Sequence, residues 1–516
     1  MLTGVARCEW RHRPSSLQFS RAILRYSLEG DCRRIAQFCV VGRSDARVCR
    51  VRDQRVRTLN RFIDNGIRDR NTVPPLVAPP LLFDGVVRTK HAPRRHLLLS
   101  LSILVAFAAP RPTSAQETQP GSLPPGWITP TPAGLLAEPA LLRKLVATSE
   151  SKASDEQEPA DGLYVETGNM ITGEGWISAG PGYRRHMLDR RLRVDASAAV
   201  SWKLYNVGQV SVEMPRLAHD RLTVGAQVMR QDLQQVDYFG LGNDSRVSDL
   251  SAYRFTNTDI LGYATVQATR WLVLSGRFGG IPRSRLGAAG GPRVPVPSTV
   301  DLFSDASAPG ILAPPSFLHG DVQVNVDLRD HKGHPTGGGL YQFIAATYLD
   351  RDSGTYTFRR YEVDAAQFVP LFTKRWILAL HGREVFSDTT SGHVVPFYLM
   401  PSLGGKNTLR GYHDYRFHDD DMQAFSGEVR CALFTHLDVA VFADAGKVAA
   451  RAGNLDFQNL KRSYGAGLRV HNATATLVRL DVGHSVEGWQ VFIKISDPFK
   501  RSLPMSGRSA VVPFVP

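Results

Sequence analysis

The sequence predicts an all-β fold, a sixteen-stranded antiparallel β-barrel that crosses a membrane. Between Gly162 and Phe499, segments of about ten residues alternate apolar with polar side chains and are separated by turn residues. Sixteen such segments can be counted, an even number, as a single-chain bacterial barrel requires. Long connections follow the fifth, seventh, eleventh and thirteenth segments, as expected when long loops share one end of a barrel. The first, third and ninth connections are short, so this asymmetry is partial.

The predicted strands are short and closely spaced. They cover residues 163–171, 176–187, 191–206, 207–217, 221–233, 252–268, 270–280, 317–329, 338–352, 356–369, 374–388, 422–435, 436–447, 461–472, 474–484 and 488–496. In the last one, Trp489, Val491 and Ile493 face one way, whereas Gln490 and Lys494 face the other. This alternation is typical of a wall with lipid on one side and water on the other. We therefore expect residues 162–499 to form the barrel.

Residues 91–115 are interpreted as a signal peptide. A basic start precedes a predominantly apolar segment of thirteen residues, Leu97–Ala109, and the small residues Thr113–Ala115 then offer a cleavage site before Gln116. A segment of thirteen residues is too short for a membrane-spanning helix, which needs roughly 20. The protein is therefore expected to be exported through the inner membrane and to reach the cell outer membrane.

The basic excess of the chain is confined to its N-terminal part. Residues 1–95 hold 20 Lys and Arg against 8 Asp and Glu, whereas from Gln116 onward the counts are 41 and 40. A nearly neutral body argues against a nucleic-acid partner. Because about ninety residues do not normally precede a signal peptide, residues 1–90 are interpreted as a mis-started or disordered basic leader. The alternative is a genuine N-terminal extension.

Two further segments flank the predicted barrel. Residues 116–161 are rich in Pro, Gly, Ser and Glu and are expected to form a flexible periplasmic segment, with a possible short helix at 135–148. Residues 500–516 are expected to form a C-terminal tail. Cys431 is the only cysteine after the leader, which excludes a disulfide framework and a multi-cysteine zinc site. We interpret it as a small apolar filler.

The segment Leu403–Tyr412, which reads Leu-Gly-Gly-Lys-Asn-Thr-Leu-Arg-Gly-Tyr, follows the eleventh predicted strand. Two isolated acids, Glu428 and Asp444, then lie within apolar predicted strands, and alternation with apolar neighbours places them in the lumen. A buried charge needs a partner, and Arg410 is the candidate because a guanidinium can bind two carboxylates at once. The competing interpretation is an ordinary charged lumen with a mobile loop.

These residues resemble motifs of the BamA/TamA family of outer-membrane proteins, the bacterial surface antigen family. Gly404-Gly405 followed by Arg410-Gly411-Tyr412 is similar to the sixth extracellular loop of that family. A turn between the eighth and ninth predicted strands is also similar to the family's. The residues that match in this turn are Asp327, Arg329, Asp330, Pro335 and Gly337. The matches keep their order, and the resemblance covers roughly residues 162–499.

The resemblance implies that the loop folds back into the barrel and that Arg410 pairs with Glu428 and Asp444. Gly411 would then let the backbone pass close to the wall, and Tyr412 would anchor the loop. The resemblance also implies a protein that assists insertion or translocation of polypeptides at the outer membrane. Its partners would be outer-membrane lipid and unfolded outer-membrane or secreted polypeptides. The sequence leaves the oligomeric state open, and we expect a monomer.

The alternative function is a passive pore or a structural surface antigen without client proteins. Family members that act in assembly carry POTRA domains before the barrel, and residues 116–161 are too short to hold one. A weak seam between the first and last strands would suit the assembly function, because an unpaired strand edge can template a client strand.

No enzymatic activity, cofactor or metal site is expected. The sequence has no Gly-x-Ser-x-Gly elbow, His-Glu-x-x-His helix or P-loop. An acidic cluster that includes His413, Asp414 and the residues from His418 to Asp421 matches no defined ligand spacing. The segment Asp237–Gly242 is interpreted as aromatic girdle residues followed by a turn.

The interpretation of residues 1–115 predicts the N-terminus of the mature protein. Signal cleavage after Ala115 should leave Gln116 as the first residue. Mass spectrometry of the N-terminal peptide of the membrane-associated protein would check this. A first residue far from Gln116 would contradict the interpretation of the whole leader.

Overall fold

The computed structural model describes residues 134–144, 146–147, 161–167, 178–290, 296–331, 334–472 and 476–494. The predicted leader (1–90), signal peptide (91–115) and C-terminal tail (500–516) lie outside the described residues, as does most of the predicted flexible segment (116–161). These assignments stay predictions.

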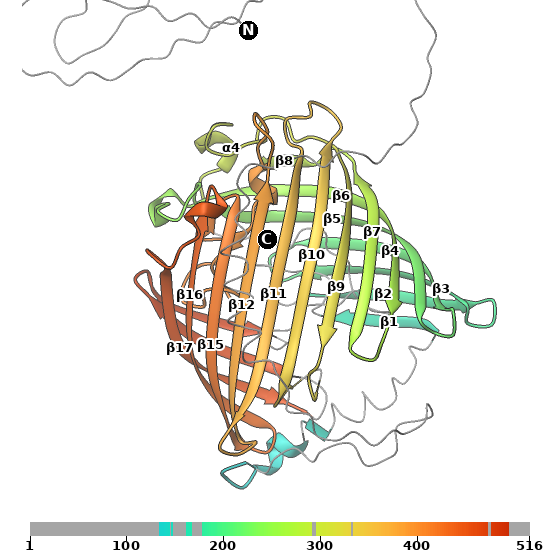
Figure 1. Cartoon of the computed structure of the whole chain (residues 1–516), viewed down its shortest axis with the longest axis vertical. Helices are drawn as coiled ribbons and strands as arrows, with labels where there is room; N and C mark the ends of the chain where they lie inside the picture. Colours follow the sequence, from blue (N-terminus) through green and yellow to red (C-terminus); the bar gives the residue numbers. More distant parts are fainter. Residues whose placement is uncertain are drawn as a thin grey trace, which may run out of the picture. The chain divides into compact units, whose positions relative to one another are not determined.

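Sixteen antiparallel strands form one curved wall (Figure 1). They are β1 (Gly162–Thr167), β2 (Ser178–Met187), β3 (Leu192–Ser201), β4 (Asn206–Leu217), β5 (Leu222–Tyr238), β6 (Ser251–Gln267), β7 (Leu272–Ile281), β9 (Phe317–Asp327), β10 (Gly338–Asp350), β11 (Phe358–Leu371), β12 (Trp376–Asp388), β15 (Asp421–Phe434), β16 (Leu437–Ala449), β17 (Lys461–His471), β18 (Thr476–Ser485) and β19 (Gly488–Lys494). Each coincides with one predicted segment, so the predicted antiparallel barrel fold is confirmed.

Smaller elements lie in the connections. A four-residue strand, β8 (Arg285–Ala288), pairs with β6 and makes the sheet seventeen-stranded. The other elements are the helix α4 (Thr299–Leu302), the 3-10 turns η2 (Val247–Asp249), η3 (Phe397–Leu399) and η4 (Ala452–Asn454), and the two-residue strands β13 (Ser402–Leu403) and β14 (Phe417–His418). Sequence alternation cannot reveal strands of two to four residues, because the period needs several repeats to be visible.

Each long strand pairs with the next one along the wall. The pairing is longest between β5 and β6, where the register runs from Leu222↔Val266 to Tyr238↔Ser251. Within the described residues, β1 and β19 are each paired on one side only, with β2 and β18 respectively. None of the helices in the described part of the chain is long and apolar enough to cross a membrane.

Apolar side chains face outward along the strands and polar side chains face inward. On β19, Trp489, Val491 and Ile493 are exposed, as the alternation predicts. Inside, charges are buried in pairs, for example Arg277 with Asp321 across β7 and β9 (2.7 Å). This polarity is the reverse of that in a soluble protein and matches a lipid-facing exterior around a polar lumen.

Aromatic side chains fill the end of the lumen below the long connections. Tyr238 lies edge-on against Phe397, with ring centroids 4.9 Å apart, and donates a hydrogen bond to the carbonyl oxygen of Ser307 (2.7 Å). Tyr238 and Phe239 are 0% and 1% exposed. The prediction that the segment Asp237–Gly242 supplies aromatic girdle residues was therefore wrong. These rings point inward because the connection between β7 and β9 folds over the end of β5.

The described residues before the barrel lie against its opposite end. The backbone NH groups of Leu135 and Leu136 donate to the carbonyl oxygens of Ala432 (3.0 Å) and Leu433 (2.9 Å). Glu138 then accepts a hydrogen bond from the backbone of His436 (3.1 Å), in the turn between β15 and β16. Residues 140–144 are helical, within the predicted helix at 135–148. This part of the predicted flexible segment is therefore tied to the barrel.

Because the outer face of the wall is apolar, the effect of an added charge on stability should depend strongly on its position. Val441, in the middle of β16, is 56% exposed. Val441→Arg should lower the free energy of unfolding in a lipid bilayer by about 2–4 kcal/mol if the site lies near the midplane. Val486→Arg, in the exposed turn between β18 and β19, is the matched control and should cost little. Equal effects at both positions in denaturant titrations would contradict the lipid-facing assignment of β16.

Candidate functional site

The connection between β12 and β15 turns back into the lumen. Its two short strands pair as a small hairpin, with Ser402 opposite His418 and Leu403 opposite Phe417. Its apolar side chains are buried against the inner wall. This cluster comprises Leu403, Leu409, Tyr412 and Phe417 from the connection, with Val385, Met422, Ala424 and Val448 from β12, β15 and β16. Burial of this apolar surface holds the connection inside the barrel.

The paired glycines form the tight turn within this connection. Gly404 and Gly405 have φ angles of +117° and +80°, a region that favours glycine. A Cβ at Gly404 would collide with the carbonyl oxygen of His413. The backbone NH of Gly405 donates to the carbonyl oxygen of Tyr412 (3.1 Å). The turn therefore fixes where the Arg-Gly-Tyr sequence begins.

Arg410 lies between two acids of the inner wall. Its Nη1 donates to Oε2 of Glu428 on β15 (2.6 Å), and its Nη2 and Nε donate to the two carboxylate oxygens of Asp444 on β16 (2.8 and 3.0 Å). Nη2 also donates to Oγ of Ser426 (2.9 Å). Arg410 is 2% exposed, and both acids are buried as deeply. The structure thus brings these three residues into contact across three separate segments of the chain.

The surroundings of Arg410 leave little free space. Its guanidinium carbon lies 3.5 Å from the ring centroid of Phe442 on β16. A Cβ at Gly411 would lie 2.7 Å from the backbone carbonyl of His484, so a larger residue would push the loop off the wall. Oγ of Ser485 donates to the carbonyl oxygen of Gly411 (2.6 Å). Tyr412 is 1% exposed and packs edge-on against Phe417.

The charge network extends beyond the residues predicted from the sequence. Arg430 and Arg469 both contact Glu428, with shortest distances of 2.8 and 2.9 Å. Asp481 on β18 contacts Arg469 (2.6 Å) and Arg479 (3.2 Å). Four arginines therefore surround three carboxylates in the buried wall. The sequence does indicate these residues, because each is a charged residue at an inward position of a largely apolar strand.

The electrostatics keep Arg410 charged. Burial alone would lower the pKa of Arg410, but the carboxylates of Asp444 and Glu428 outweigh it and raise this pKa above its usual value. A permanently charged guanidinium cannot exchange protons with a substrate in ordinary conditions, so the arrangement suits mechanical support better than acid–base chemistry.

The second predicted motif shapes the turn between β9 and β10. Arg329 Nε and Nη2 each lie 2.8 Å from a carboxylate oxygen of Asp327. Asp330 accepts hydrogen bonds from the backbone NH and the hydroxyl of Thr336, and its own NH donates to the carbonyl oxygen of Gly337 (3.1 Å). Pro335 is buried in the same turn. These contacts give the turn a defined shape.

The acidic cluster after the Arg-Gly-Tyr sequence does not assemble into a group of three metal ligands within the described residues. Burial lowers the pKa of His418 to about 3, so this imidazole is neutral at physiological pH. Burial and the neighbouring Asp419 raise the pKa of Asp420 to about 6. The cluster lies among buried aromatic rings, and His418 packs edge-on against Tyr238.

Residues 318–488, which include Arg410, Glu428 and Asp444, match the model of the Omp85 superfamily domain. The barrel is similar in fold to BamA from Haemophilus ducreyi lacking POTRA domains 1–3, at 15% identity and a TM-score of 0.50. The match covers 70% of this chain and 83% of the BamA chain.

Two CdiB structures also match the barrel. CdiB from Acinetobacter baumannii is 14% identical, with a TM-score of 0.40 and coverage of 64% of this chain and 58% of the CdiB chain. CdiB from Escherichia coli is 14% identical, with a TM-score of 0.42 and coverage of 66% and 63%. None of the curated proteins compared with the chain matches it in sequence.

Replacing Arg410 by Ala would leave Glu428 and Asp444 buried without their shared cation. We expect the free energy of unfolding to fall by roughly 3–5 kcal/mol. Arg410→Lys keeps the charge but loses the planar fork, so its effect should be intermediate. The double variant Glu428→Gln with Asp444→Asn should also be less stable. Heat resistance of the folded form on gels, together with denaturant titration in detergent, provides the measurement.

Arg462→Ala is the matched control for these variants. Arg462 is an exposed arginine of β17, next to Ser463 of the network, and its removal should leave heat resistance unchanged. If the Arg410 variants resist heat as the parent does, the contact has no structural role.

Proposed function

We propose that this barrel resides in the outer membrane, exported by its signal peptide, and assists insertion or translocation of other polypeptides there. The observation that carries the proposal is the inward loop, which is attached both to the rigid wall and to the last strand. The proposed partners are membrane lipid and unfolded outer-membrane or secreted polypeptides. The proposed role is non-enzymatic and requires one copy of the chain.

The proposed route for a client is the seam between the first and last strands. Within the described residues, β1 and β19 each pair on one side only, with β2 and β18. Leu163 and Val165 of β1 are 84% and 71% exposed. An edge strand that pairs on one side only can pair with an incoming strand.

The loop provides a link between the seam and the wall. Nζ of Lys494 on β19 donates to Oδ1 of Asn407 (2.9 Å), and Gln490 on β19 lies 3.4 Å from His413. Between these contacts, Arg410 is fixed to β15 and β16. A displacement of β19 would break two weak contacts at the loop but leave the buried ion pairs intact. Arg410 would thus hold the wall in place while the seam opens.

The proposal predicts catalysis of insertion by the purified barrel. Vesicles that contain the parent protein should fold a model outer-membrane client faster than empty vesicles, measured by its heat-resistant band. Arg462→Ala, which leaves the buried network intact, should match the parent. The same preparations in planar bilayers would report conductance. Conductance without faster client folding would overturn the proposal and favour a passive pore or structural surface antigen.

A further inference from the structure

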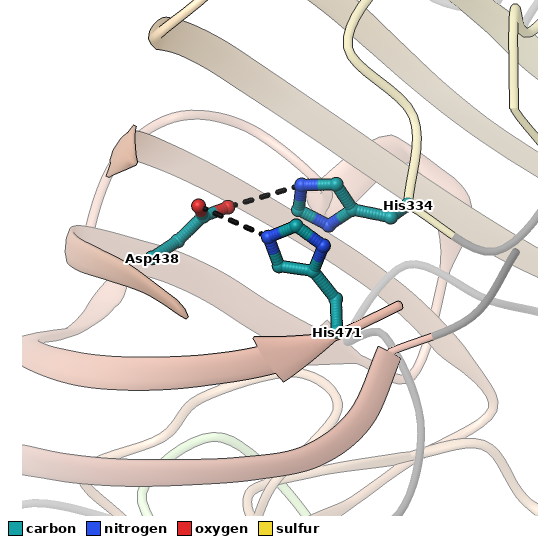
Figure 2. A group of neighbouring side chains, drawn as sticks. All are labelled: His334, Asp438 and His471. Atoms are coloured by element: carbon teal, nitrogen blue, oxygen red, sulfur yellow. Dashed lines mark hydrogen bonds and ion pairs between the residues drawn. The ribbon is translucent and has the colours of Figure 1, made fainter. Parts of the chain in front are cut away.

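Three buried side chains with metal-ligand atoms meet at the short-turn end of the barrel. They are His334 in the turn between β9 and β10, Asp438 at the start of β16, and His471 at the end of β17 (Figure 2). Nε2 of His334 lies 3.2 Å from Oδ2 of Asp438, and Nε2 of His471 lies 3.3 Å from Oδ1. The three residues are between 1% and 7% exposed. Their ligand atoms all lie within 4.8 Å of one another.

The spacing of these atoms suits a transition-metal ion. Ligand atoms about 2.0–2.2 Å from a tetrahedral ion lie roughly 3.3–3.5 Å from one another, close to the two measured distances. The two imidazole rings are stacked, with centroids 3.5 Å apart and planes 6° apart, and their Nε2 atoms face the two different oxygens of one carboxylate (Figure 2). Because the rings are parallel, they must tilt apart for both Nε2 lone pairs to point at one ion. Two imidazoles and one carboxylate favour zinc or a similar ion over magnesium or calcium.

The hydrogen-bond partner of His471 also suits metal binding. Nδ1 of His471 lies 3.4 Å from the carbonyl oxygen of Asn472. Such a backbone carbonyl can hold the proton on Nδ1, which leaves Nε2 free to bind an ion.

The position of the cluster gives an ion a structural role. Three strands, β11, β12 and β15, separate β10 from β16 in the wall. Neighbouring strands lie about 4.8 Å apart, so the four spacings along the wall from β10 to β16 add up to roughly 19 Å. His334 nevertheless contacts Asp438, so the turn between β9 and β10 reaches across this end of the barrel. Only a turn of defined shape can do this, and the Asp327–Arg329 and Asp330–Thr336 contacts provide that shape.

We propose that His334, Asp438 and His471 bind one divalent transition-metal ion of the zinc class, which ties the turn between β9 and β10 to β16 and β17. Three protein ligands leave a fourth coordination position for water. The site lies away from Arg410 and is independent of the proposed transport function. Without an ion, both imidazoles would instead donate hydrogen bonds to Asp438, and the same geometry would be a metal-free strut.

Cobalt(II) and zinc(II) binding to the refolded full chain, stripped of metal with a chelator, tests the site. The parent should bind one equivalent of cobalt(II), with the intense visible absorption of four-coordinate cobalt, and zinc(II) should displace it. His334→Asn and His471→Asn should each weaken binding about 100-fold or more, because the ligand is lost. His319→Asn is the matched control, since His319 is buried against Asp259 (2.8 Å) and belongs to no three-ligand group among the described residues, so this variant should bind as the parent does.

A second measurement on the parent protein covers the case in which the variants fail to fold. Zinc(II) in excess should raise the temperature at which the parent loses its heat-resistant form, because an ion that binds only the folded state stabilises it. A parent protein that binds no saturable cobalt(II) and gains no heat resistance from zinc(II) would overturn the proposal. Unchanged binding in folded His334→Asn and His471→Asn would also overturn it.

Discussion

The neutralisation of buried charge is the constraint on which the rest of this barrel depends. A guanidinium that is 2% exposed cannot be left without carboxylates, and Arg410 finds two of them on neighbouring strands. This requirement explains why the loop enters the lumen along one path, with glycines where the backbone turns and where it passes the wall. It also explains why three further arginines and Asp481 gather around the same acids.

The constraint acts through strand register. A strand that slips by one residue moves all its inward side chains to the lipid face, so Glu428 and Asp444 would leave Arg410 and enter lipid. In the observed register Ser426 lies opposite Asp444, and its hydroxyl donates to the Asp444 carboxylate (2.7 Å). The ion pair and the outward apolar residues, such as Val441, therefore specify the same register from opposite faces of the wall.

Much of this arrangement could be predicted from the sequence because its physical signals are local. The strands appear in the sequence as an alternation of apolar and polar residues with a period of two. An isolated acid in an apolar strand, such as Glu428, indicates an inward position. The other features depend on contacts between distant segments. The sequence predicts Tyr238 to be a girdle residue, but the connection between β7 and β9 covers it, and His334 has no neighbouring ligand in the sequence. Nothing local to residues 134–138 indicates that they pair with the turn between β15 and β16.

Two segments of the chain, the loop with Arg410 and the turn with His334, contact the same pair of strands, β16 and β17. Arg410 enters from the long-loop end and contacts Asp444 on β16, with Ser463 of β17 beside that carboxylate (3.4 Å). His334 enters from the other end and contacts Asp438 on β16, which also contacts His471 of β17. β16 and β17 are therefore braced at both ends, whereas β19 contacts the loop through the side chains of Lys494 and Gln490. Because deformation concentrates where bracing is weakest, the edge formed by β19 should move before β16 and β17 do.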